Sequence, residues 1–350
     1  MRPYLRNLFI LSVTLLACMG TAKAQTYETA VDYLNYTQKV NADLTATYLA
    51  YLSAVSHGKG ARKVEKRRQE VVNAITDSRM LIMGMPPWKG DRSLKDTTIA
   101  HLKILNIVFN EDYGKIVNME EIAEQSYDAM EAYMLAQEKA QEKLNDAAER
   151  QHRMQRVFAE KNNITLVDGG ESELEMKARI VDEVMTHANA VYLVFFKSYK
   201  QESYLMDALS KKNIVSIEQN LSSLQKNSDE GREKLKALKG YKNDASLLSA
   251  CRNALNFYES EAKQGAVMTD YFLKEENFMK LKKQFESKPA GKRTQQDVDE
   301  FNKAVSDINT AMKTYNKTNE DLNKQRTAML NEWNKTYSKY LDEYMPKQSK

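Results

Sequence analysis

Residues 294–344 contain neither glycine nor proline, and apolar side chains recur among them every three or four positions. This spacing places the apolar side chains along one narrow stripe of a single long α-helix. A helix with one apolar stripe buries that stripe against neighbouring helices and exposes the rest, as in antiparallel bundles. The stripe comprises Phe301, Val305, Ile308, Met312, Tyr315, Leu322, Met329, Trp333 and Tyr340, with Asn319, Arg326 and Thr336 in its polar gaps.

The stretch 115–161 has the same pattern, and as one helix it would be roughly 70 Å long. The composition agrees, because 12 glycines and 5 prolines among 350 residues are too few for the turns of a many-stranded protein. We therefore predict an all-α protein of elongated, antiparallel helical bundles. The expected helices span 27–57, 61–83, 93–112, 115–161, 171–211, 214–238, 245–264, 266–287 and 294–344, with Ser93 and Asp244 as N-caps.

The first 24 residues have the features of a secretory signal. Two arginines precede the apolar run 8–18, and the segment ends in Ala-Lys-Ala before Gln25. This order of a basic region, a short apolar region and small residues predicts cleavage after Ala24. An alternative cleavage would leave Cys18 as a lipid-modified N-terminus. Either cleavage predicts an exported protein, periplasmic or associated with the surface of a bacterial envelope.

The formal charge of +4 depends on this segment. Removing residues 1–24 deletes three basic residues and no acidic one, which leaves the mature chain at +1. A nearly neutral chain gives no electrostatic case for nucleic-acid binding. Beyond Ala24 no apolar run approaches the roughly 20 residues of a membrane helix, so we expect no transmembrane segment in the mature chain and a lipid anchor only at Cys18.

A short motif occurs twice, 153 residues apart. The sequence WKGDRSL at 88–94 matches YKNDASL at 241–247. The match predicts two related helical bundles, at 25–161 and 171–350, joined by a linker at 162–170. Because an aromatic residue recurs at the first position, we expect its ring to pack over the end of a bundle. The candidate interaction loops comprise Trp88, Lys89, Asp91, Tyr241, Lys242 and Asp244.

Few residues offer reactive chemistry. Glu149 and His152 have the Glu-x-x-His spacing of metal-binding helical bundles, and Glu183 with His187 is the best second pair. The second pair has a different spacing, and a solvated helix surface explains the first pair more simply. Nucleophile, Cys-x-x-Cys, phosphate-loop and dinucleotide motifs are absent from the sequence, so we expect neither catalysis nor a cofactor.

Three segments form a combined pattern: AVSHGKGARKVE at 54–65, MPPWKGD at 85–91 and NEDYGKIVNMEEI at 110–122. Together they resemble a family of uncharacterised bacterial surface proteins, first named from a leptospiral surface lipoprotein and also found in Bacteroidetes. The resemblance covers mainly residues 30–145. It implies export or surface location, and it implies no known activity.

These observations favour an exported, envelope-associated helical protein that acts as a non-catalytic binding or scaffolding module. Its expected partner is an envelope protein or a glycan. The alternative is a periplasmic protein that binds a small ligand or a metal.

Overall fold

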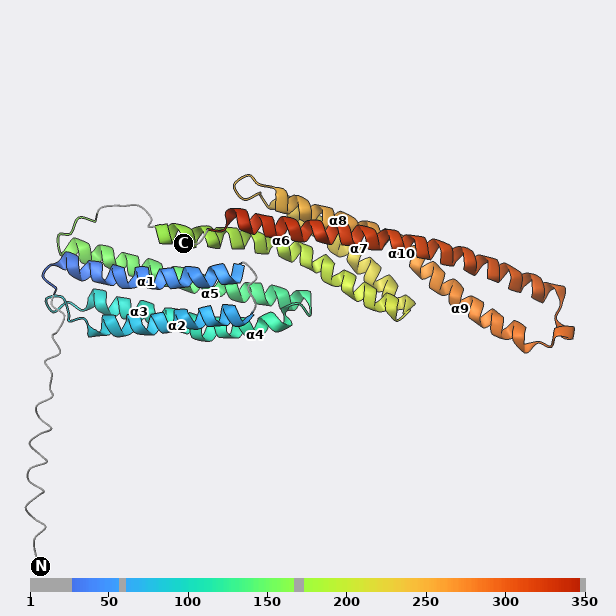
Figure 1. Ribbon diagram of the computed structural model, residues 1–350, viewed down its shortest axis with the longest axis horizontal. Coiled ribbons are helices and arrows are strands. Elements are labelled where there is room, and N and C mark those ends of the chain that lie inside the picture. Colours follow the sequence, from blue (N-terminus) through green and yellow to red (C-terminus); the bar gives the residue numbers. More distant parts are fainter. Residues whose placement is uncertain (1–26, 57–60, 167–172, 347–350) are drawn as a thin grey trace, which may run out of the picture. The chain divides into compact units, whose positions relative to one another are not determined.

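The computed structural model describes residues 27–56, 61–166 and 173–346 (Figure 1). Within these ranges the chain is helical apart from its turns, with isolated β-bridges and no β-strand, so the all-α prediction is confirmed. No helix of these ranges is both long and apolar enough to span a bilayer. The elements are α1 (Ala30–Ser56), α2 (Ala61–Gly84), α3 (Ser93–Ile107), the π-helix η1 (Val108–Asp112), α4 (Tyr113–Ala123), α5 (Tyr127–Lys161), α6 (Glu173–Ser210), α7 (Ile214–Ala237), α8 (Ser246–Gln264), α9 (Ala266–Ser287), the 3₁₀ turn η2 (Ala290–Lys292) and α10 (Gln295–Tyr344).

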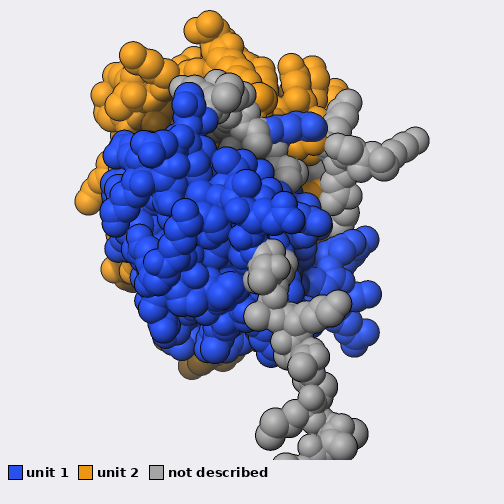
Figure 2. All heavy atoms as spheres, turned by 90° about the vertical axis from the view of Figure 1, so that its left-hand side faces the viewer, with its two compact units in different colours: residues 1–51, 62–113, 140–174 blue, residues 52–61, 114–139, 175–350 orange. Residues whose placement is uncertain are grey.

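The chain divides into two compact units, which Figure 2 colours separately. Unit 1 consists of the described residues of 1–51, 62–113 and 140–174, and unit 2 of those of 52–61, 114–139 and 175–350. This division assigns 114–139 to unit 2, whereas the predicted boundaries place that segment in the first bundle. Those boundaries stay a prediction. The proposed signal with Cys18, and part of the proposed linker, lie outside the described residues.

The predicted helix at 115–161 is wrong at one point, because the chain turns a corner at residues 124–126. Helix α4 ends at Ala123, and α5 begins at Tyr127. The hydroxyl of Ser126 accepts a hydrogen bond from the backbone N–H of Ala129 at 3.1 Å, which satisfies one of the free donors at the start of α5. Ser126 also fits the helical stripe, so its spacing alone hides this capping role.

The break expected at Gly114 is likewise absent. The π-helix η1 continues directly into α4, and Gly114 lies inside that helix. The rings of Phe109 and Tyr113 stack at 5.0 Å, and Tyr51 of α1 packs edge-on against both. We attribute the wider π-turn to this cluster, which fixes two aromatic residues four positions apart on the same side.

Unit 2 has its core where α6, α7, α8 and α10 meet. Trp333 of α10 stacks on Phe195 of α6 at 4.1 Å between ring centroids. Gly231 lets α7 approach closely, because a Cβ there would lie 3.0–3.2 Å from side-chain atoms of Leu255 and Val194. Cys251 is a free, fully buried thiol in this core, as expected for a small apolar residue.

Beyond this core, α9 and the first half of α10 form a hairpin joined by residues 288–294. Phe285 and Phe301 stack face to face at 4.4 Å between the two helices. Thr294 caps α10 in a capping box with Asp297: the Thr294 hydroxyl accepts from one backbone N–H, and the Asp297 carboxylate accepts from the other. We call the hairpin of residues 273–318 the α9–α10 arm.

Candidate functional site

The first predicted loop is a tight turn between α2 and α3. Trp88 and Asp91 form an antiparallel bridge, with N–O distances of 3.0 and 2.8 Å between their backbones. The residues between them have positive φ angles, 48° at Lys89 and 86° at Gly90, as in a type I′ turn. The Asp91 carboxylate then accepts from the backbone N–H of Ser93 at 2.8 Å, at the start of α3.

The second loop, between α7 and α8, repeats this conformation. Tyr241 and Asp244 form the bridge, and φ is 49° at Lys242 and 68° at Asn243. The Asp244 carboxylate accepts from the backbone N–H of Ser246 at 2.7 Å. The prediction that Ser93 and Asp244 are N-caps is wrong, because the cap positions are Arg92 and Ala245. In each loop the aspartate one residue earlier bonds the new helix. We call the two loops the paired turns.

In unit 1 the aromatic residue of the turn packs inward. The Trp88 ring lies against Tyr33 of α1, with centroids 5.7 Å apart, and Tyr33 stacks on Phe158 of α5. The Trp88 indole N–H donates to Asn162 Oδ1 at 2.7 Å, and the Tyr33 hydroxyl donates to the carbonyl of Pro86 at 3.0 Å. The ring therefore closes this part of unit 1 instead of facing a partner.

In unit 2 the corresponding partner is a histidine. Tyr241 packs against His187 of α6 at 6.3 Å, and its hydroxyl donates to Glu183 at 3.0 Å. His187 Nε2 lies 3.0 Å from the carbonyl of Lys239, and the hydroxyl of Tyr340 lies 2.8 Å from Nδ1. Because a carbonyl only accepts, Nε2 carries the proton and Nδ1 accepts from Tyr340. Burial lowers the pKa of His187, which favours this neutral ring.

The two surroundings correspond in position as well as in kind. The carbonyls bonded by Tyr33 and by His187 belong to Pro86 and Lys239, which are 153 positions apart, the offset of the sequence match. Each turn thus points its aromatic ring into its own unit. Its lysine remains exposed, with the ammonium 5.4 Å from the Trp88 centroid in one turn and 5.2 Å from the Tyr241 centroid in the other.

Charge around the second turn is balanced by neighbours. Hydrogen bonds from Arg179 and then Tyr241 lower the pKa of Glu183, and burial with the bond to Glu183 raises the pKa of Tyr241 to about 12. Burial alone would raise the pKa of Asp244, but hydrogen bonds from Ser246 and Tyr344 lower it overall. The carboxylates stay ionised and the phenol stays neutral at neutral pH.

The proposed metal ligands lie in two different settings. Glu149 pairs with Arg153 at 3.4 Å on an exposed side of α5, and His152 is also exposed. Glu183 and His187 belong to the second turn, where the ring nitrogens of His187 already bond to protein groups. In the described part of the chain, no group of three or more His, Cys, Asp or Glu residues is arranged to hold a metal. The structure thus lends the metal hypothesis no support.

A buried charged cluster in unit 2 was missed by the sequence reasoning. Arg326 of α10 donates to Glu202 of α6 and to Glu261 of α8, and both carboxylates are almost fully buried. Glu261 Oε2 and the nearby Tyr258 hydroxyl have no hydrogen-bond partner among the described residues. Burial, reinforced by the charge of Glu202, raises the pKa of Glu261 to about 8. The position of Arg326 in a gap of the apolar stripe was the available signal.

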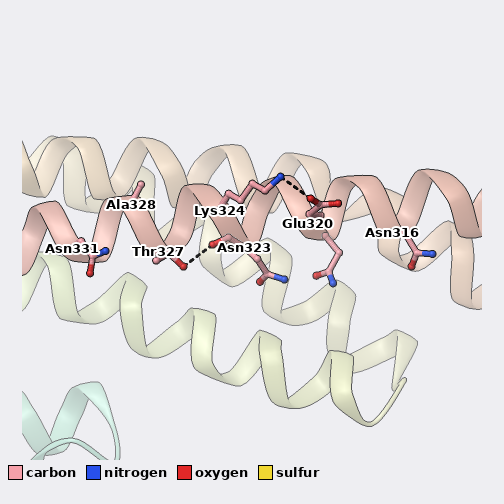
Figure 3. Close-up of a pocket in the computed structure, with 8 residues that line it drawn as sticks. Asn316, Glu320, Asn323, Lys324, Thr327, Ala328 and Asn331 are labelled. Atoms are coloured by element: carbon pink, nitrogen blue, oxygen red, sulfur yellow. Dashed lines mark hydrogen bonds and ion pairs between the residues drawn. The ribbon is translucent and has the colours of Figure 1, made fainter.

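A hollow of about 690 Å³ runs along α10 (Figure 3). Its lining comes from α10 alone and is rich in amide side chains. Lys324 pairs with Glu320 at 2.6 Å, and Thr327 bonds to the carbonyl of Asn323 at 2.9 Å. Because one helix supplies every lining residue, this is an open polar surface and not an enclosed site. The residues are Asn316, Asn319, Glu320, Asn323, Lys324, Thr327, Ala328 and Asn331.

Comparison with known proteins adds no assignment. No family model, no curated protein and no solved structure matches this chain.

Proposed function

We propose that the protein is an exported, envelope-associated helical module that binds or scaffolds an envelope protein or glycan without catalysing a reaction. The N-terminal segment and the resemblance to bacterial surface proteins support export. The observation that carries the binding role is the pair of turns, one in each unit, which have the same backbone conformation and present a lysine at the same position.

The turns are suited to binding because they are already rigid. Backbone bridges, the aspartate bonds to α3 and α8 and the packed rings hold them in one conformation. A preorganised loop loses little conformational entropy when it binds. Two such loops on one chain add avidity when both engage the same surface. The exposed ammonium groups of Lys89 and Lys242 favour an acidic partner surface.

Binding of the purified protein to isolated envelopes tests this role. We expect Lys89→Glu and Lys242→Glu each to reduce co-sedimentation, and the double variant to lose it by more than the product of the single effects. Lys236→Glu is the matched control, because Lys236 is also exposed but lies inside α7, outside the turns. A double variant that co-sediments like the wild type would contradict the proposal.

Export has a separate test. The mass of the protein recovered from the envelope fraction should correspond to a chain that begins at Gln25, or to one that begins at an acylated Cys18. An intact N-terminus at Met1 in protein from the cytosolic fraction would overturn the localisation and leave the binding test unaffected.

A further inference from the structure

Unit 2 contains a groove that the paired turns do not use. It lies where the start of α5 meets α6 and α7, and its volume is about 310 Å³. At 30 Å³ for each water molecule, this is the space of about ten waters, which suits a short hydrocarbon chain of about ten carbons. The lining residues are Tyr127, Glu131, Ala190, Leu193, Val194, Lys197, Glu230, Gly231, Lys234, Ala237 and Leu238.

The groove exists because its walls carry small side chains. Ala190 of α6 and Ala237 of α7 face a space that larger residues would fill. Gly231 cannot fill it either, since its nearest neighbours leave little room for a Cβ. Leu193 and Leu238 complete a floor that is mainly apolar. Ligand sites in proteins typically combine such an apolar lining with a few polar groups.

The polar groups at the rim pair with one another, with one exception. Lys197 forms a 2.7 Å ion pair with Glu230, and its ammonium lies 5.4 Å from the ring centroid of Tyr127. The Tyr127 hydroxyl donates to Glu131 at 2.9 Å. The ammonium of Lys234 forms no salt bridge with any residue that the structure describes. One exposed cation therefore stands unpaired beside an apolar groove.

From this combination we infer that the groove binds a medium-chain alkyl carboxylate. The hydrocarbon lies on the floor between α6 and α7, and the carboxylate pairs with Lys234. The unpaired cation favours an anionic head group, and the groove volume limits the chain to about ten carbons. This site goes beyond the proposed binding role of the paired turns and does not depend on it.

Calorimetric titration of the full chain with decanoate, below its micelle concentration, tests the inference. We expect one bound decanoate per chain. Lys234→Met should weaken decanoate binding at least about tenfold and leave the binding of decanol, which has no charge, unchanged. The matched control is Lys236→Met on the same helix, whose lysine pairs with Glu233 away from the groove, and it should bind decanoate like the wild type.

A second variant tests the groove itself. Ala237→Phe, at the exposed end of α7, should abolish the binding of both decanoate and decanol. If this variant melts below the wild type, Ala190→Leu fills the groove from the α6 side and replaces it. No decanoate binding by the wild type at millimolar concentration would overturn the inference, as would equal losses in the Lys234 and Lys236 variants or full binding by a filled groove. None of these outcomes bears on the envelope experiment.

Discussion

Arg326 lies among apolar residues of α10, yet it is held by two buried carboxylates, Glu202 and Glu261. Two carboxylates and one guanidinium leave a net negative charge in the core if all are ionised. Because a buried charge without a matching partner is costly, the cluster retains a proton on Glu261 up to a pKa of about 8. The fold therefore takes up a proton that the unfolded chain would release at lower pH.

This proton makes stability depend on pH. Between the ordinary pKa of a glutamate and about 8, the folded state holds one more proton than the unfolded state, so the free energy of unfolding falls as pH rises through this window. Glu261→Gln cannot ionise. We expect it to raise stability at pH 8.5 by about 1–2 kcal/mol, a part of the roughly 1.4 kcal/mol per pH unit that linkage allows, and to give no gain at pH 5.

Chemical denaturation at the two pH values measures this effect. Glu320→Gln is the control, because Glu320 pairs with Lys324 on the exposed side of α10 and burial does not raise its pKa. Equal changes at pH 5 and pH 8.5 for Glu261→Gln would show that Glu261 does not carry the proton.

Trp88 allows its packing and its hydrogen bond to be separated. Trp88→Phe keeps a ring against Tyr33 but removes the N–H bonded to Asn162, and we expect a loss of about 1 kcal/mol. Trp88→Ala removes the ring as well and should cost about 3 kcal/mol. Thermal denaturation of both variants measures these losses. An alanine variant as stable as the wild type would show that the ring does not hold unit 1 together.

At the scale of elements, the paired turns predict which substitution each position accepts. Gly90 has a φ of 86°, and Asn243 occupies the same position of the other turn at 68°. Asparagine tolerates this left-handed region, whereas alanine is strained there by about 1–2 kcal/mol. A Cβ at Gly90 meets no atom within 4 Å, so strain alone decides the outcome. We expect Gly90→Asn to be nearly neutral and Gly90→Ala to lower the free energy of unfolding by about 1 kcal/mol.

Urea denaturation distinguishes these two variants. If the asparagine variant loses as much stability as the alanine variant, the two turns are not interchangeable in conformation, and the repeated sequence has a weaker structural meaning.

Periodicity identified the helices well, because an apolar stripe specifies which residues are buried whatever their partners are. It failed at Ser126, where a capping hydroxyl fits the same spacing as a stripe residue. It also failed at Gly114, because a glycine inside a helix looks like a boundary when its surroundings are unknown. The paired turns were found from their repeated letters. Their neighbours His187 and Glu183 were not, since only tertiary packing brings α6 beside α7 and α8.

At the scale of the whole molecule, the compact units do not follow the chain order. Segment 114–139 belongs to unit 2, where Ala123 and Met130 pack on the fully buried Phe196 of α6. Sequence alone could not place this segment, because its stripe fits either unit. A fragment of residues 171–350 lacks it and exposes Phe196.

We therefore expect the fragment 171–350 to melt several degrees below the fragment 114–350, since burial of a large side chain contributes about 1.5–3 kcal/mol. Calorimetric melting of the two fragments provides the measurement. Equal melting temperatures would mean that 114–139 adds no stability to unit 2.

The α9–α10 arm also determines how unit 2 would respond to a mechanical load. Both of its helices end at residues 288–294, so tension applied at this turn acts along their axes. In that direction the seam between Phe285 and Phe301 is sheared, and its contacts must break together, not one after another as in unzipping. Helix α10 continues without interruption to Tyr340 and Tyr344, which contact His187 and Tyr241. Tension at the arm is thus carried by one unbroken helix to the residues that hold the second turn.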